Sequence, residues 1–284
     1  TASAVVTVTV TGGSENSVHV INSPDGDGTK VLVVRGSSAG DKIDVKLGSL
    51  ANTFKIKIKT GALGGSIGSV ADPTAGHIGA GGSFHMGTFK FDQSAEAISK
   101  VIVYGLDGND SIKVHSTVGV MGWLFGGNGD DKLRGGKGDD LLVGGAGNDK
   151  IDGKAGRDIL IGGLGADKMR GKQDEDILIA GSTIYDDNLA ALSVIMKEWT
   201  SANSFADRVA NIFSGSGASS RANGSFFFDN TTVNVSDGEI DKLDGGAGAD
   251  WFIADELSDG DKVKGFDVGE DIFGLDGDWF NLDP

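Results

Sequence analysis

The sequence predicts an all-β fold, a solenoid in which short parallel strands stack along one axis, and three observations predict it. Glycine accounts for 48 of the 284 residues and proline for 3, without the three-residue glycine period of collagen. Hydrophobic residues make up 38% of the chain, which is too many for a disordered polymer. From residue 126 to residue 179, one nine-residue unit occurs six times without a gap, with glycine first, aspartate sixth and an apolar residue eighth.

Each nine-residue unit is predicted to form a six-residue turn and then a three-residue strand. Glycine permits the positive φ angles that tight turns need. The middle residue of each strand points inward and its two neighbours point outward, so two units make one 18-residue coil with strands on opposite sides. The sixth-position aspartates then form two columns: Asp131, Asp149 and Asp167 in the first column, and Asp140, Asp158 and Asp176 in the second column.

The stacking of these aspartates predicts a bound cation. Neighbouring strands lie about 4.8 Å apart, so the carboxylates of one column would repel each other if nothing lay between them. A hard divalent cation removes this repulsion and accepts the turn carbonyls as further oxygen ligands.

The units, such as GGNGDDKLR at 126–134 and GGKGDDLLV at 135–143, resemble the RTX (hemolysin-type) calcium-binding nonapeptide GGxGxDxUx. The resemblance implies a parallel β-roll that holds several Ca²⁺ ions. It also implies that each ion lies between successive turns of a column. The ligands would be carbonyls 1 and 3 of the first turn, carbonyls 2 and 4 of the second, and both aspartates. Carried over, the four sites take Gly126, Asn128, Asp131, Gly145, Gly147 and Asp149; Gly144, Ala146, Asp149, Gly163, Gly165 and Asp167; Gly135, Lys137, Asp140, Lys154, Gly156 and Asp158; and Gly153, Ala155, Asp158, Lys172, Asp174 and Asp176.

Two further points concern individual turn residues at the ligand positions that the resemblance implies. Gly127 and Gly129, at positions 2 and 4 of their turn, are predicted to be metal ligands as well. Lys172 and Asp174 stand where the family has glycine, which puts the last of the four sites in doubt.

The repeat signature also extends to both sides of the six units. An aspartate followed two residues later by an apolar residue recurs upstream and downstream, and GSSAGDKIDV at 36–45 parallels GLDGNDSIKV at 105–114. We therefore expect a β-rich N-terminal region at 1–104, the roll at 105–179, a small helical insertion at 180–235 and a continuation of the roll at 236–284. Further metal ligands are predicted at Asp110, Asp241, Asp250, Asp261 and Asp271.

The outward residues of the predicted strands differ between the two sides of the roll. Those after one column are polar, as in Lys132 and Arg134, and those after the other are apolar, as in Ile159 and Ile161. One sheet therefore faces water, while the other carries an apolar stripe that needs a cover.

The insertion is the predicted cover of this stripe. DDNLAALSVIMKEW at 186–199 has apolar residues at helical spacing, and Ser204 with Asp207 predicts the start of a second helix. Two other hypotheses remain for this segment: a helical pair with its own contacts, or an interface with another molecule.

The first 104 residues predict strands with less regular spacing. Apolar and polar residues alternate in VTVTVT at 6–11 and TFKIKIKT at 53–60, and glycine-rich loops are expected at 61–88. This region is predicted to be a small sheet domain or a decorated extension of the roll.

The composition restricts the partners. The net charge of −16 argues against nucleic acid and anionic membranes. No apolar run reaches the roughly 18 residues of a membrane span, and without cysteine there is no disulfide or thiolate ligand. Because residue 1 is threonine, we expect the sequence to be processed or excerpted.

No catalytic motif stands out, so we predict that the protein is not an enzyme. The chain has no HExxH, GGSIG at 64–68 around Ser66 lacks a strand–turn–helix context, and PDGDG at 24–28 departs from a calcium-binding EF-hand loop.

The predicted function is that of an extracellular or cell-surface structural protein whose roll folds on binding Ca²⁺, such as a matrix, filament or S-layer subunit. It would form a homo-oligomer or polymer, with residues 1–11 as a candidate for strand addition. The alternative is an accessory or secretion module of a larger secreted enzyme or adhesin. Carbohydrate binding by the 61–88 loops is a third, weaker hypothesis.

Overall fold

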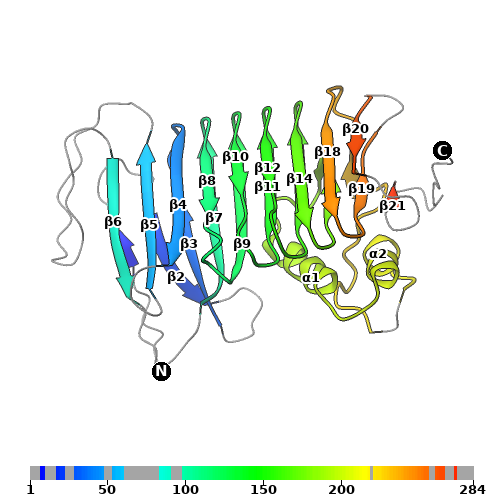
Figure 1. Ribbon diagram of the computed structural model, residues 1–284, viewed down its shortest axis with the longest axis horizontal. Helices are drawn as coiled ribbons and strands as arrows, with labels where there is room; N and C mark the ends of the chain where they lie inside the picture. Colours follow the sequence, from blue (N-terminus) through cyan, green and yellow to red (C-terminus); the bar gives the residue numbers. More distant parts are fainter. Residues whose placement is uncertain are drawn as a thin grey trace.

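The computed structural model describes residues 7–9, 17–22, 29–47, 53–60, 83–90, 98–217, 220–255, 260–265 and 272–273. In these residues two long sheets lie face to face along one axis (Figure 1). The first sheet contains, in spatial order, β1 (Thr7–Thr9), β2 (Ser17–Asn22), β3 (Lys30–Arg35), β7 (Ile98–Asp107), β9 (Met121–Asn128), β11 (Leu141–Ala146), β13 (Ile159–Leu164), β15 (Ile177–Ile179), β19 (Trp251–Ile253) and β21 (Ile272–Phe273). The second sheet contains β20 (Lys262–Lys264), β18 (Lys242–Ala247), β14 (Lys168–Gln173), β12 (Lys150–Asp152), β10 (Lys132–Arg134), β8 (Ser111–Val114), β4 (Asp41–Leu47), β5 (Thr53–Thr60) and β6 (Ser83–Lys90).

The chain winds between the two sheets in coils, so the stacked strands are parallel. Leu142 on β11 lies beside Leu160 on β13, and Leu133 on β10 lies beside Ile151 on β12, each pair 18 residues apart. Ile112 on β8 lies beside Leu133, so the coil between them contains three more residues. The all-β parallel roll predicted from the repeat is confirmed.

The core of the roll is filled by the inward residues of both sheets. These are the eighth-position residues of the repeat units and their equivalents, and all of them are at most 1% exposed. Each buried side chain of this size contributes roughly 1.5–3 kcal/mol. The first sheet supplies Leu124, Leu142, Leu160, Leu178 and Phe252, and the second supplies Ile112, Leu133, Ile151, Met169 and Leu243.

The N-terminal strands continue both sheets of the roll. β3 pairs in parallel with β7 and β4 with β8, so Lys30–Leu47 adds a further coil. β1, β2, β5 and β6 add antiparallel strands at that end. The glycine-rich loop expected at 61–88 is wrong for Ser83–Thr88, which belong to β6, because SFHMGTFK contains β-favouring aromatic residues and pairs with β5.

The segment between β15 and β18 leaves the roll and returns to it in register. β16 (Ser182–Thr183) pairs with β17 (Val233–Asn234) at its base. α1 (Leu189–Trp199) begins after Asn188, and α2 (Phe205–Phe213) begins after Ser204, whose hydroxyl accepts from Asp207 N–H at 3.2 Å. Met169 on β14 then lies beside Leu243 on β18, so the roll resumes as if uninterrupted.

Both helices belong to the same buried apolar cluster as the outward residues of the first sheet. Within this cluster are Ile159, Ile177 and Trp251 from the sheet, and Ile195 and Ile212 from the helices. The apolar stripe is therefore covered within the chain. Among the described residues, no helix is long and apolar enough to cross a membrane.

A partly buried ion-pair network links α2 to the roll. Glu175 lies at the fifth position of the turn 171–176, and its Oε2 accepts from Arg208 Nη2 on α2 at 2.5 Å. The same oxygen lies 2.8 Å from Nε of Arg157, the fifth-position residue one coil earlier. The position of α2 is thus linked directly to two successive turns of the second column.

Candidate metal centre

The sixth-position aspartates form two buried columns at the edges of the roll. Ten of the eleven predicted aspartate ligands are at most 5% exposed, although carboxylates normally face water. Asp271 lies outside the described residues. The ten buried aspartates are Asp110, Asp131, Asp140, Asp149, Asp158, Asp167, Asp176, Asp241, Asp250 and Asp261.

One carboxylate oxygen of each aspartate is held by the coil before it. The N–H of Asp131 donates to Asp149 Oδ1 at 2.7 Å, and the N–H of Asp149 donates to Asp167 Oδ1 at 2.8 Å. The same bond joins Asp140 to Asp158 at 2.8 Å in the second column. It also crosses the insertion in both columns, from Asp167 to Asp241 at 2.6 Å and from Asp176 to Asp250 at 2.9 Å.

The other oxygen, Oδ2, is buried without a hydrogen-bond partner in six of these aspartates, within the part of the chain that the structure describes. A buried acceptor left unpaired costs about 1–3 kcal/mol, and more when it is charged. Such an orphaned oxygen calls for a ligand that the polypeptide does not supply. The six are Asp110, Asp131, Asp149, Asp158, Asp167 and Asp176.

The first glycine of each turn leaves the space that this oxygen occupies. A Cβ on Gly126 would overlap Asp131 Oδ2 and lie 2.5 Å from the carbonyl oxygen of Gly144, one coil later. Gly105 stands in the same relation to Asp110 Oδ2 and the Gly126 carbonyl. A carboxylate oxygen and a carbonyl oxygen therefore converge beside each of these glycines.

Positions 2 and 4 of the turns have positive φ. Gly145 and Gly147 have φ of 111° and 126°, and Lys172 and Asp174 adopt the same region with φ of 100° and 69°. The doubtful turn 171–176 therefore keeps the backbone shape of the other turns despite its non-glycine residues. The same conformation is found at Gly127, Gly129, Lys154, Gly156, Gly163, Gly165, Gly246 and Gly248.

The turn 135–140 differs from the others. Gly136 and Gly138 are not among the residues with positive φ, and Asp140 Oδ2 accepts from Gly136 N–H at 2.6 Å. The segment one coil earlier is the loop before β9, so no equivalent turn stacks beneath Gly136 and Gly138. This turn is therefore the first of the second column, and the carboxylate of Asp140 is hydrogen-bonded within the turn itself.

The turn carbonyls point in directions that differ from those the predicted ligand sets require. The carbonyl oxygen of Ala146 accepts from Gly129 N–H at 2.7 Å, so position 3 faces the earlier turn. The carbonyl of Gly144 also faces the earlier turn, while that of Gly127 faces Gly145 on the later one. The predicted residues are thus in the turns, but the carbonyls of Gly145 and Gly147 face the later turn 162–167 and not the gap between turns 126–131 and 144–149. The carbonyls in that gap are those of Gly127, Gly129, Gly144 and Ala146.

The same carbonyl directions are found in the next gap of the first column and in the first gap of the second column. The carbonyl of Gly145 faces Gly163, and that of Gly147 faces Gly165. In the second column, the carbonyl of Gly138 faces Gly156. The carbonyl of Gly153 in turn faces Gly135 on the earlier turn.

Burial makes the charged form of these carboxylates costly. It raises the pKa of Asp131 and Asp149 to about 7, and burial together with neighbouring carboxylates raises the pKa of Asp167 to about 8. In the second column, burial and the adjacent aspartates raise the pKa of Asp158 well above its ordinary value. A cation in the column would reverse this penalty.

The donor set fits a hard divalent cation that takes backbone oxygen. Among the described residues, no group of three or more His, Asp or Glu side chains could hold a metal, so a site in the columns requires turn carbonyls. Two aspartates and several carbonyls per gap are the oxygen-rich set that Ca²⁺ prefers.

One column member was missed from the sequence as a site residue. Asp41 is 3% exposed, and its N–H donates to Asp110 Oδ1, so it precedes Asp110 in the first column. Its Oδ2 accepts from Ser37 N–H at 2.6 Å. The parallel between residues 36–45 and 105–114 was the signal that could have identified it. Ser66 and the 24–28 segment lie outside the described residues.

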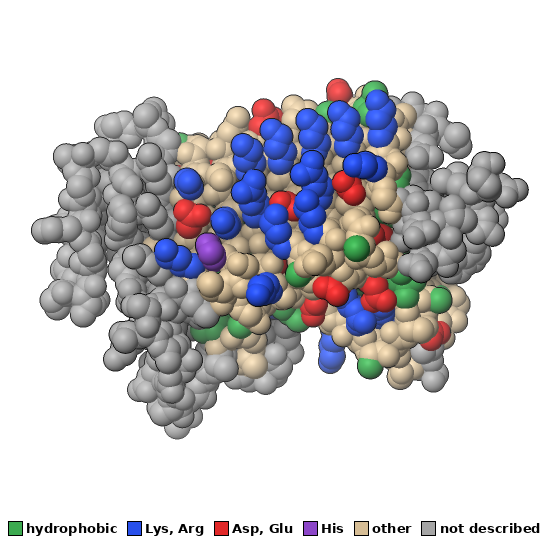
Figure 2. All heavy atoms as spheres, viewed as in Figure 1, with side chains coloured by type: hydrophobic (Ala, Val, Ile, Leu, Met, Phe, Trp, Pro, Cys, Tyr) green, Lys and Arg blue, Asp and Glu red, His purple; other side chains and the backbone are tan. Residues whose placement is uncertain are grey.

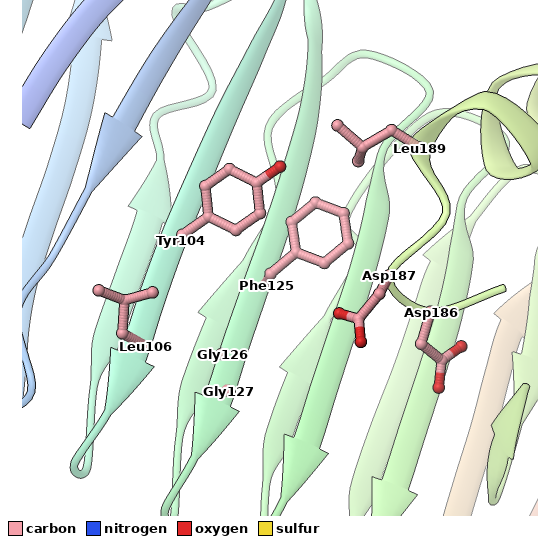
Figure 3. Close-up of a pocket in the computed structure, with 8 residues that line it drawn as sticks. All are labelled: Tyr104, Leu106, Phe125, Gly126, Gly127, Asp186, Asp187 and Leu189. Atoms are coloured by element: carbon pink, nitrogen blue, oxygen red, sulfur yellow. The ribbon is translucent and has the colours of Figure 1, made fainter. Parts of the chain in front are cut away.

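A separate cavity of about 180 Å³ lies where the roll meets the start of the insertion (Figure 3). Tyr104 and Phe125 stack at 5.0 Å on one side, and Asp187 and Leu189 line the other. Asp186 also lines it, but both of its oxygens accept from Thr183. The cavity touches the turn at Gly126 without containing an aspartate of either column.

Comparison with known proteins identifies the repeat. The family model of the RTX calcium-binding nonapeptide repeat matches in four copies, over residues 125–160, 143–178 and 236–259. No curated protein and no solved structure matched the chain. The matched residues contain β10–β14, most of β15, β18 and β19, on both sides of the insertion, with the aspartates that precede these strands. Residues 125–178 and 236–259 are therefore RTX calcium-binding nonapeptide repeats, and their strands belong to the parallel β-roll.

Proposed function

We propose that the roll folds when it binds Ca²⁺, in a non-enzymatic structural protein that works outside the cell. The observation that carries this proposal is the buried, unpartnered Oδ2 of Asp131, Asp149 and Asp167. Each lies beside a glycine that leaves room for it and near a carbonyl oxygen of the next coil. Without a cation, these oxygens oppose folding.

The ligands of one site can be named from the gap between the turns 126–131 and 144–149. Asp131 would contribute Oδ2, and Asp149 would complete the pair of carboxylates. The carbonyls of Gly127, Gly129 and Gly144 face this gap. Ca²⁺ would supply positive charge at this gap, because neither Asp131 nor Asp149 forms an ion pair with a residue that the structure describes.

Metal binding and folding would be coupled. The ligands come from turns 18 residues apart and meet only when the coils stack, so binding free energy becomes folding free energy. Extracellular calcium modules have dissociation constants of about 10⁻⁴–10⁻³ M. A roll tuned to that range would stay unfolded at low cytoplasmic calcium and fold after export.

Circular dichroism in calcium and in EGTA tests the proposal. We expect the strand signal to be lost in EGTA and restored by Ca²⁺ but not by Na⁺. Asp149→Asn should shift the calcium midpoint upward, whereas Asp187→Asn, which changes an exposed carboxylate outside the columns, should not. A strand signal that survives complete chelation at pH 8.5, where the column carboxylates are deprotonated, would sink the proposal.

Two features support a structural role: the burial of the column aspartates and the position of β1 at the end of the first sheet. The aspartates are buried in the stacking of the coils, which leaves them no access to a substrate. β1 is the last described strand of the first sheet and pairs with β2 on one side only. An edge strand of this kind can pair with another copy, so residues 1–11 remain our candidate for assembly.

Electron microscopy of the native material distinguishes this role from that of an accessory module of a larger secreted enzyme or adhesin. Ordered polymers would support the structural role, and dispersed particles carrying a further domain would support the accessory module. Deletion of residues 1–11 should abolish assembly. Polymers that form normally without these residues would exclude strand addition by β1.

A further inference from the structure

One line of outward positions on the second sheet is occupied by lysine on five successive strands. In the parallel ladder, Lys132 lies beside Lys150, Lys150 beside Lys168, Lys168 beside Lys242, and Lys242 beside Lys262. All five are exposed. Figure 2 shows lysine and arginine side chains gathered over this face. We call these five residues the lysine row.

The lysine row is electrostatically unfavourable within the isolated chain. Neighbouring strands are about 4.8 Å apart, and like charges directly opposite each other destabilise a sheet. None of the five lysines forms an ion pair with any residue that the structure describes. The chain as a whole has a net charge of −16, yet it places no acid within this row.

The parallel row of outward positions beside it is mixed. It holds Lys113, Arg134 and Arg170, but also Asp152 and Asp244. Asp244 Oδ2 lies 4.0 Å from Lys264 Nζ, and Asp152 accepts from Lys154. The lysine row is therefore the line of outward positions on which positive charge is not interrupted by an acid.

We propose that the lysine row binds a linear anionic polysaccharide, a chain of sugars that carries carboxylate or sulfate groups and lies along the roll axis. A straight polymer on this line meets five lysine heads in succession and avoids Asp152 and Asp244 on the adjacent row. Charge complementarity of this kind favours fast association and selects partners of negative charge. The proposal depends on the folded sheet and not on which ligands hold the metal.

Other polyanions fit the same face less well. A plane of anionic lipid headgroups would contact both rows and would bring negative charge against Asp152 and Asp244 as well as against the lysines. The grooves of duplex DNA admit a helix or a two-stranded ribbon, whereas this sheet is broad. Single-stranded nucleic acid is usually held by stacking on aromatic residues, and the outward positions of β8, β10, β12, β14, β18 and β20 hold none.

Surface plasmon resonance with the calcium-folded chain tests the proposal directly. We expect binding to immobilised chondroitin sulfate, no binding to neutral dextran, and a steep fall in affinity as NaCl is raised. Equal retention on dextran would overturn the proposal. So would tighter binding to duplex DNA, or to vesicles containing phosphatidylserine, at the same ionic strength.

Two matched variants locate the contact. Lys150→Gln with Lys168→Gln should weaken binding about 30-fold, since each lysine near anionic charge contributes roughly fivefold. Lys197→Gln with Arg221→Gln removes the same charge from exposed positions on the insertion and should leave affinity within about twofold. Circular dichroism in calcium checks that both variants are folded. Equal losses of affinity in the two variants would show that binding depends on the overall charge of the chain, and would overturn the proposal.

Discussion

The backbone N–H of Asp131 donates to Oδ1 of Asp149 at 2.7 Å, although the two residues are separated by a complete coil. The same carboxylate keeps its Oδ2 buried beside Gly144, with no hydrogen-bond partner among the described residues. Asp149 therefore joins two coils through one oxygen and leaves the other for a ligand. This division of roles within one side chain is the basis of the predictions below.

Adding a methyl group at the first position of a turn should destabilise the roll through steric overlap. In Gly126→Ala, the new Cβ would overlap Asp131 Oδ2 and lie 2.5 Å from the Gly144 carbonyl oxygen. We expect a loss of about 1–3 kcal/mol in the free energy of unfolding and a higher calcium midpoint. Gly119→Ala is the control, because nothing lies within 4 Å of its Cβ. Equal urea midpoints for the two variants would contradict the crowding described here.

Relieving backbone strain in the turn 171–176 should stabilise the protein. Lys172 has φ of 100°, a region that costs an L-residue roughly 1–2 kcal/mol. Lys172→Gly should therefore raise the free energy of unfolding by about 1 kcal/mol after the entropy cost of glycine. Lys197→Gly, which places glycine inside α1, should lower it by about 1 kcal/mol. Urea unfolding in saturating calcium measures the free energy of unfolding of both variants. A decrease in both would contradict the backbone strain at Lys172.

The metal-free roll should become less stable as pH rises. Burial raises the pKa of Asp131 and Asp149 from the ordinary value of 3.8 to about 7, and that of Asp110 and Asp167 to about 8. Because the folded state binds these protons more tightly than the unfolded state, folding is favoured most below about pH 4. This stability is lost progressively up to about pH 8.

Circular dichroism of protein freed of calcium beforehand, in calcium-free buffers at pH 5 and at pH 8.5, measures this dependence. We expect more strand signal at pH 5. Calcium should act in the opposite direction, because it binds the deprotonated carboxylates and releases protons. A metal-free strand signal that does not change between these two pH values would show that the columns are not protonated on folding.

Removing the acid that links the insertion to the roll should loosen the two helices. In Glu175→Gln, Arg208 on α2 keeps a buried charge, with a side chain 1% exposed, but loses its carboxylate partner at 2.5 Å. We expect a loss of about 2–3 kcal/mol. Hydrogen exchange should rise in Leu189–Trp199 and Phe205–Phe213 before it rises in the core strands. Glu239→Gln, an exposed acid after β17, is the matched control.

The repeat alone determined the roll, its period and its buried aspartates. Glycine, aspartate and an apolar residue at fixed spacing in 126–179 are consistent with only one arrangement, in which Leu142 and Leu160 stack inward and Asp140 and Asp158 stack at the turn. The two helices were also predictable, since Ser204 with Asp207 and the apolar spacing of 189–199 are local signals. Local periodicity carries this information because each coil repeats the same contacts.

The tertiary structure decided what depends on direction and on contacts between distant residues. The carbonyl of Ala146 faces Gly129 and not the later turn, which follows from the hydrogen bonding of the stacked strands and not from the composition of the turn. Asp41 and Asp110 meet although 69 residues separate them, because the inserted strands β5 and β6 fold to the end of the second sheet. The lysine row exists only because residues as distant as Lys168 and Lys242 lie side by side across the insertion. Charge along a sequence does not specify charge on a surface until the register of the strands is known.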